Sequence, residues 1–148
     1  GARFLGERVS LRLEGRAGRI AFGGMTVAWR IVARRGIETV ARRPRRESLD
    51  ADRVGPDIVL RHWQPGDRFC PIGQEADVKL QDLFVNAGVP RAQRHGRVIG
   101  VTAGGDLFWV EGLRMAERFR ITARTRSWLD WRWDRGARQT VAGAGGQC

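Results

Sequence analysis

The sequence has few of the residues from which catalytic and metal sites are commonly built. It contains two histidines and two cysteines, and no HExxH, CxxC or G-x-S-x-G motif surrounds them. The only lysine, Lys79, follows a valine, so no glycine-rich phosphate loop is present. Cys70 and Cys148 provide neither a disulfide framework nor a paired metal spacing. We therefore expect a reducing compartment, no catalytic residue, no metal site and no cofactor bound to this chain.

Long apolar segments are also missing. No run approaches the roughly 20 residues that span a bilayer, and no signal-peptide pattern is present. The 42% apolar and 29% charged content is typical of a globular protein, and 148 residues suit about one domain with a real core. We expect a soluble, cytoplasmic protein with no membrane partner. The first residues, Gly1 and Ala2, indicate a fragment or a processed chain.

Positive charge is abundant but unevenly distributed. The net charge is +11, and 26 of the 27 basic residues are arginines. Residues 1–56 carry +7, residues 57–122 carry +1 and residues 123–148 carry +3. Such an excess is typical of nucleic-acid binding proteins. A genome-wide preference for arginine codons would explain the arginines, but it does not explain why a single lysine remains.

Alternating apolar residues predict two half-buried strands near the start, over residues 9–13 and 25–33. Glycines predict turns at residues 15–18 and 23–24.

Regular alternation stops over residues 34–56. The run at residues 42–46 places four arginines around Pro44. It cannot form a central strand, because the proline lacks a backbone N–H for the ladder and the like charges repel one another. The run is either a solvated loop or a segment that meets phosphates, and we favour the loop.

One main helix is predicted after residue 77. Asp77 suits its N-cap, Gly88 suits the left-handed position after its end, and Pro90 prevents continuation and suits the start of a short second helix over residues 91–95. The apolar residues have helical spacing and predict one buried face: Leu80, Leu83, Phe84 and Ala87.

Further strands are predicted on both sides of this helix. Residues 57–63 form one, residues 97–102 and 107–110 form a hairpin, and residues 118–122 form a last short strand. Residues 136–148 are expected to be disordered. The fold class is therefore α+β. Three tryptophans are expected to cover an edge of the domain: Trp128, Trp131 and Trp133.

His62 and Asp67 stand close together around a Pro-Gly turn. They allow a free-standing hydrolase as one interpretation. We favour the other, in which the turn aspartate bonds to local backbone.

Three ordered motifs carry a family resemblance. They are Arg61-x4-Gly66-Asp67-Arg68-Phe69, then Lys79-Leu80-x-Asp82-x-Phe84, then Phe108-Trp109-Val110-x-Gly112-Leu113-Arg114. Together they resemble the C-terminal domain of tRNA(Ile)-lysidine synthetase. The resemblance implies a β-sandwich with helices, similar to a module in the β subunit of phenylalanyl-tRNA synthetase. It suggests a strand-rich part at 1–48, the recognition domain at 49–122 and a tryptophan-containing extension with a tail at 123–148.

The resemblance also implies a function. The parent enzyme is a ligase that uses ATP to attach lysine to the wobble cytidine of tRNA(Ile). In that family a Ser-Gly-Gly-x-Asp-Ser loop binds the phosphates of ATP in an N-terminal domain, and this loop does not occur here. We therefore expect ATP and magnesium only in that catalytic domain. This chain is expected to recognise the acceptor-stem side of the tRNA, with tRNA(Ile) and the remaining domains of the enzyme as its partners.

Residue roles divide into two groups. The residues expected to contact RNA are Lys79, Arg91, Arg94 and Arg97, because an ammonium near a helix start and a following arginine cluster suit phosphates. The residues expected to form the structural framework are Arg61, Gly66, Asp67, Arg68, Phe69, Gly112 and Arg114. The alternative hypothesis is a protein-interaction or scaffolding module that touches no RNA.

Overall fold

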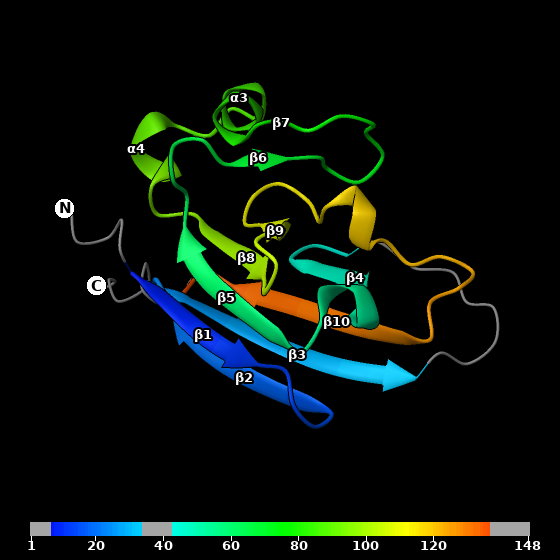
Figure 1. Cartoon of the computed structure of the whole chain (residues 1–148). Coiled ribbons are helices and arrows are strands. Elements are labelled where there is room, and N and C mark those ends of the chain that lie inside the picture. The colour runs from blue at the N-terminus through cyan, green and yellow to red at the C-terminus, as the bar shows by residue number, and fades with distance from the viewer. Residues whose placement is uncertain (1–6, 34–42, 137–148) are drawn as a thin grey trace.

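The computed structural model describes residues 7–33 and 43–136 (Figure 1). Two antiparallel four-stranded sheets pack face to face, and a small two-stranded ribbon with two short helices lies on the far side of the first sheet from the second. The α+β class with sandwich-like strands is therefore confirmed. Of the tail expected to be disordered, residues 136–148, all but Gly136 lie outside the described residues.

The first sheet contains the predicted hairpin. Its order is β1 (Arg8–Arg12), β5 (Asp57–His62), β8 (Val98–Thr102) and β9 (Leu107–Val110). All five residues of β8 are buried, because this strand has the second sheet on one side and the ribbon and helices on the other.

The second sheet joins strands from distant parts of the chain. Its order is β2 (Ala17–Phe22), β3 (Met25–Ala33), β10 (Ser127–Asp134) and β4 (Arg46–Asp50). The prediction that the tryptophans cover an edge is wrong, since all three lie in β10, which pairs with β3 and β4 on its two sides. The period of two at Leu129, Trp131 and Trp133 marks a strand with one face turned inwards.

The predicted turn at residues 15–18 is confirmed only in its first half: Gly15 has a φ of 70°, but β2 begins at Ala17. Gly18 lies opposite Trp29 in the ladder, and a Cβ atom on Gly18 would stand 2.5 Å from the indole ring. This glycine therefore makes room for the ring within a strand and does not open a turn.

Strand β4 and a one-turn helix, α2 (Ala51–Val54), were not predicted. The strand lies at a sheet edge, where the preceding proline does no harm. The helix begins because the carboxylate of Asp50 accepts hydrogen bonds from the backbone N–H groups of Asp52 and Arg53 at 3.0 and 3.2 Å. Of the basic run at residues 42–46, Arg42 lies outside the described residues.

The helical end comprises β6 (Arg68–Phe69), β7 (Val78–Lys79), α3 (Leu80–Asn86) and α4 (Arg91–Arg94). The predicted N-cap, Asp77, is wrong, because the next two residues pair with β6 and α3 begins only after Lys79.

The predicted end of α3 is confirmed. Gly88 has a φ of 74°, its N–H donates to Val85, and the N–H of Val89 donates to Phe84. The predicted short second helix is α4. The predicted last strand at residues 118–122 is wrong, since η1 (Glu117–Phe119) is a 3-10 turn there.

The core lies between the two sheets and under α3. Leu80 and Phe84 of α3 are fully buried, as their spacing predicts, and Leu83 is half-buried. Ala87 is exposed, so its predicted place on the buried face is wrong. Trp131 meets Phe108 and Trp109 edge to face, with ring centroids 5.2 and 5.5 Å apart. These aromatic contacts join β10 to β9 across the two sheets.

A glycine in the core tests this packing. Gly100→Ala is expected to lower the free energy of unfolding by about 1–3 kcal/mol, because its Cβ would stand 2.5 Å from the buried ring of Phe108. Gly104→Ala is the matched control, since nothing lies closer than 3.9 Å to its Cβ. Urea unfolding of both variants measures the difference, and equal stabilities would contradict this packing.

Candidate nucleic-acid interface

A buried ion pair fixes the turn that leads into the helical end. Two nitrogens of Arg61 donate to the two carboxylate oxygens of Asp67 at 2.9 Å each, and the backbone N–H of Gln64 donates to the same carboxylate at 2.8 Å. The two charged side chains are only 12% and 10% exposed. The carbonyl of Asp67 then accepts from the N–H of Leu80, so the turn also holds the first residue of α3.

This arrangement disfavours the hydrolase interpretation. The carboxylate of Asp67 is fully engaged by the arginine and the backbone. His62 is buried and stacks on Phe22 with 5.0 Å between ring centroids. Neither side chain is presented to a substrate.

Two further arginine–carboxylate pairs hold distant segments together. Arg114 donates to the buried Glu47 at 2.7 and 3.2 Å, which ties β4 to the turn after β9. Arg135 donates to the buried Glu111 at 2.7 and 2.6 Å. The hydrogen bonds that Arg135 donates to Glu111 raise the pKa of Arg135 above its ordinary value, although burial opposes the rise. Sequence reasoning missed three of these four residues, because the partners are 24 and 67 residues apart.

Two like charges face each other on the β6–β7 ribbon. Arg68 and Lys79 are directly opposite in the register, and both side chains are exposed. Arg68 donates to the backbone carbonyl of Asp77 at 3.1 Å, which does not neutralise its charge. Within the described residues neither side chain forms an ion pair. Like charges at directly opposite positions destabilise a ladder. The carboxylates of Glu75 and Asp77 line the same hollow as Arg68 but form no ion pair with it.

The arginines in and near α4 differ in whether their side chains are held by hydrogen bonds. Arg91 is exposed and has no hydrogen-bond partner in the described parts of the chain. Arg94 donates to the carbonyl of Val89 at 3.1 Å. Arg97 donates to Gln93 at 3.4 Å, and a Cβ added to Gly112 would stand 2.5 Å from its guanidinium.

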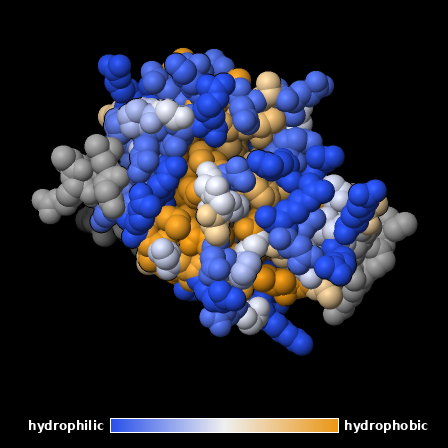
Figure 2. Space-filling view, viewed as in Figure 1, coloured by the Kyte–Doolittle hydropathy of each residue, from blue (hydrophilic) through white to orange (hydrophobic). Residues whose placement is uncertain are grey.

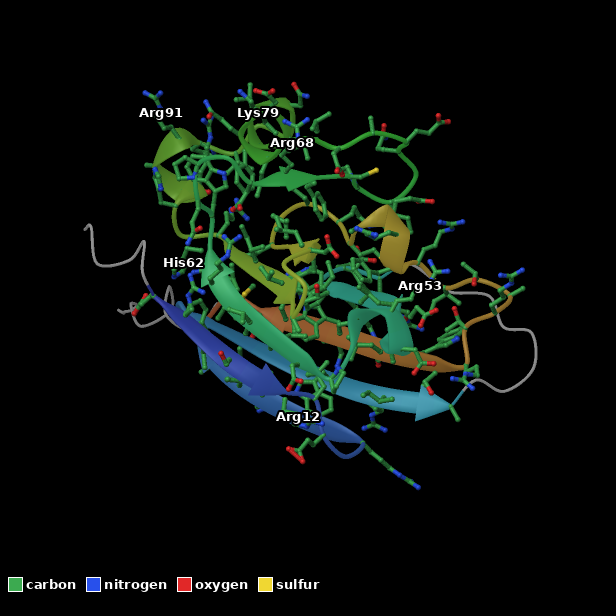
Figure 3. The ribbon with its side chains drawn as sticks, viewed as in Figure 1. Arg12, Arg53, His62, Arg68, Lys79 and Arg91 are labelled. Atoms are coloured by element: carbon green, nitrogen blue, oxygen red, sulfur yellow. The ribbon has the colours of Figure 1, made fainter. Side chains whose placement is uncertain are left out.

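Three of these cations lie at the same end of the molecule in Figure 3: Arg68, Lys79 and Arg91. Figure 2 shows mostly hydrophilic residues over this end, whereas apolar residues gather in the middle of the same view. We call this region the basic edge, and it consists of Arg68, Lys79, Arg91 and Arg94. Arg68 was expected in the framework, but its exposed position opposite Lys79 groups it with the cations of this edge.

Other chemistry has little support in residues 7–33 and 43–136. No group of three or more histidine, cysteine, aspartate or glutamate side chains there could hold a metal ion. In the same residues no helix is long and apolar enough to cross a membrane. Burial, followed by the charges of Asp77 and Glu117, raises the pKa of the Cys70 thiol, so this thiol is a poor nucleophile.

The buried pair at the turn generates a stability prediction. Asp67→Asn is expected to lower the free energy of unfolding by about 2–4 kcal/mol, because it leaves the largely buried guanidinium of Arg61 without its counter-charge. Asp57→Asn is the matched control, since its partner Arg12 is 56% exposed and the expected loss is under about 1 kcal/mol. If chemical unfolding shows that both variants lose the same free energy of unfolding, the buried pair contributes no more to stability than the exposed one.

Comparison with known proteins identifies relatives of this chain. The family model described as the TilS substrate C-terminal domain matches residues 58–133. The tRNA(Ile)-lysidine synthase of Symbiobacterium thermophilum is 42% identical over 105 residues, which cover 70% of this chain and 21% of that protein. The enzyme of Clostridium acetobutylicum is 35% identical over 82 residues, which cover 55% of this chain and 18% of that protein. The chain thus spans about a fifth of the length of these curated relatives.

Solved structures agree on the fold. The crystal structure of a TilS C-terminal domain has a TM-score of 0.68 at 18% identity and covers 86% of this chain and 97% of that one. An N-terminal fragment of the phenylalanyl-tRNA synthetase β subunit from Pyrococcus horikoshii has a TM-score of 0.51 at 14% identity, over 61% of this chain and 28% of that one. Both expected likenesses are confirmed. Because the family model covers more than half of the sequence, the chain belongs to the TilS substrate C-terminal domain family.

Proposed function

We propose that this chain is the tRNA-recognition domain, on the acceptor-stem side, of a tRNA(Ile)-lysidine synthase. The parent enzyme is an ATP-dependent ligase that joins lysine to the wobble cytidine of tRNA(Ile), in the cytoplasm. Relatives that bear this enzyme name support the proposal, and the chain spans about a fifth of their length. ATP and magnesium belong to the catalytic domain, which carries the phosphate loop that these 148 residues lack.

The observation that carries the RNA-binding role is the pair of like charges on the ribbon, neither of which forms an ion pair within the described residues. Arg68 and Lys79 repel each other across β6 and β7. An RNA phosphate beside them would receive a point charge from the lysine and a planar pair of donors from the arginine. Binding would thereby relieve a repulsion that the free chain contains.

The nature of the surface favours backbone contacts over base stacking. The large aromatic side chains near the basic edge are buried, including Phe69 and Phe84, so they cannot stack on bases. Double-stranded RNA is recognised mainly by its shape and by contacts to phosphates and 2′-hydroxyls. An acceptor stem, which is a short A-form duplex, therefore suits exposed cations better than a loop with splayed bases.

The salt dependence of tRNA binding tests the basic edge. Lys79→Ala is expected to weaken binding and to reduce the slope of log K against log salt by roughly 0.9 units, because one phosphate contact is lost. Lys79→Arg keeps the charge and should retain the slope. Filter binding with a tRNA(Ile) transcript between about 50 and 200 mM salt measures both.

A second control separates local from general attraction. Arg124→Ala removes one exposed, unpaired charge from the loop before β10 and should leave the slope unchanged. If Lys79→Ala behaves like this control, Lys79 is not a phosphate contact. If the unaltered chain binds no tRNA at about 50 mM salt, the scaffolding hypothesis replaces the proposed function.

A further inference from the structure

The outer face of the second sheet carries a row of arginines that the proposed function does not use. Directly opposite residues in an antiparallel sheet point to the same face. The register places one such row across all four strands of this sheet: Arg19 on β2, Ala28 on β3, Arg132 on β10 and Arg46 on β4. The neighbouring row contains Arg30 of β3 between Ala17 and Asp130. We call Arg19, Arg30, Arg46 and Arg132 the arginine face.

Most of this charge is not neutralised. Arg46 donates to Asp130 at 2.9 and 2.6 Å and forms an ion pair with it. Arg19, Arg30 and Arg132 are exposed, and among the described residues none of the three has an ion-pair or hydrogen-bond partner. Moreover, Arg132 stands directly opposite Arg46, so the sheet again sets like charges side by side.

A constrained turn extends the row beyond β4. Arg45 has a φ of 55° and is the only non-glycine residue of the described ranges with a positive φ. Its carbonyl accepts the N–H of Trp133 at 3.1 Å, and Arg43 forms a bridge with Arg46. The side chains of Arg43 and Arg45 are both exposed. The basic run that the sequence placed in a loop is therefore anchored, at least from residue 43, beside the arginine face.

The face is open and shallow. The position between Arg19 and Arg132 is the small Ala28, and among the described helices α3 and α4 lie beyond the first sheet (Figure 1). A hollow of about 440 Å³ lies between Arg19 and Arg132 and is also lined by Asp134. Two strand spacings separate the backbones of the two arginines by roughly 10 Å. Their long side chains can therefore reach neighbouring phosphates of one strand.

We propose that the arginine face is a second RNA-backbone contact surface, which binds a different segment of the same RNA from the one held at the basic edge. The inference rests on the proposed function only in that the chain binds RNA. Uncompensated cations around small polar and alanine positions complement a phosphate backbone. A protein partner would need more apolar area than Val32 and Trp128 provide at one end of the face.

A double variant of the whole 148-residue chain tests this surface. Arg19→Ala/Arg132→Ala is expected to reduce the slope of log K against log salt for a tRNA(Ile) transcript by about 1.8 units, and to lower affinity on the order of tenfold for each contact. Arg8→Ala/Arg124→Ala removes the same charge from elsewhere and should change the slope by less than about half a unit. Thermal unfolding checks that all variants are folded.

The outcomes separate the two claims. If Lys79→Ala lowers the slope and the arginine-face variant does not, the inference is overturned and the proposed function stands. If the control double variant lowers the slope as much as the arginine-face variant, the effect reflects only general electrostatic attraction, and the inference is again overturned. If the unaltered chain binds no RNA, both claims fail.

A cross-linking measurement supplies an independent readout. Benzoylphenylalanine introduced at residue 28, between Arg19 and Arg132, is expected to cross-link the transcript on irradiation. The same group at residue 10, an exposed position of β1 in the first sheet, is the control. Equal cross-linking at the two positions, or none at residue 28, would count against the arginine face.

Discussion

Buried pairs between arginines and carboxylates are the interaction on which this fold depends. Glu47, Asp67 and Glu111 are largely enclosed, and a carboxylate in such a place is costly unless it is paired and hydrogen-bonded. Each one receives two hydrogen bonds from a single arginine and at least one from a backbone N–H. The pairs close the turn before β6, tie β4 to the loop after β9, and tie the end of β10 to the start of β8. The aromatic contacts between β9 and β10 fill the space that these ties enclose.

Pairing with buried carboxylates also divides the positively charged residues into two groups. Arginines that meet a buried carboxylate are neutralised and hold the domain together, whereas exposed cations without such partners remain available to an anion. Two groups of the latter lie on the ribbon with α4 and on the outer face of the second sheet. A net charge of +11 would by itself say only that the protein attracts nucleic acid. The division between paired and unpaired arginines indicates where phosphates are expected to bind.

The sequence predicted elements whose signals are local. Alternation found β1, β3 and the β8–β9 hairpin, and helical spacing with Gly88 found α3 and its end. It failed where a distant partner decides the conformation. Gly18 belongs to a strand because the ring of Trp29 lies over it, and Arg46 belongs to a strand because Asp130 neutralises it on β10. The candidate site was predictable only in part. Lys79 and Arg91 could be chosen from their local sequence, one near a helix start and the other in the arginine cluster that follows. The pairing of Lys79 with Arg68 could not, because it depends on the register of a two-residue ribbon.

The most direct test of this division is NMR observation of the arginine Nε–Hε signals while a short acceptor-stem RNA duplex is added. The signals of Arg114 and Arg135 should be slow to exchange with solvent and should not move, because the Nε–H of each donates to a buried carboxylate. The signals of Arg68 and Arg91 should shift as the duplex binds. Movement of the two paired signals, or no movement of the two unpaired ones, would contradict the account.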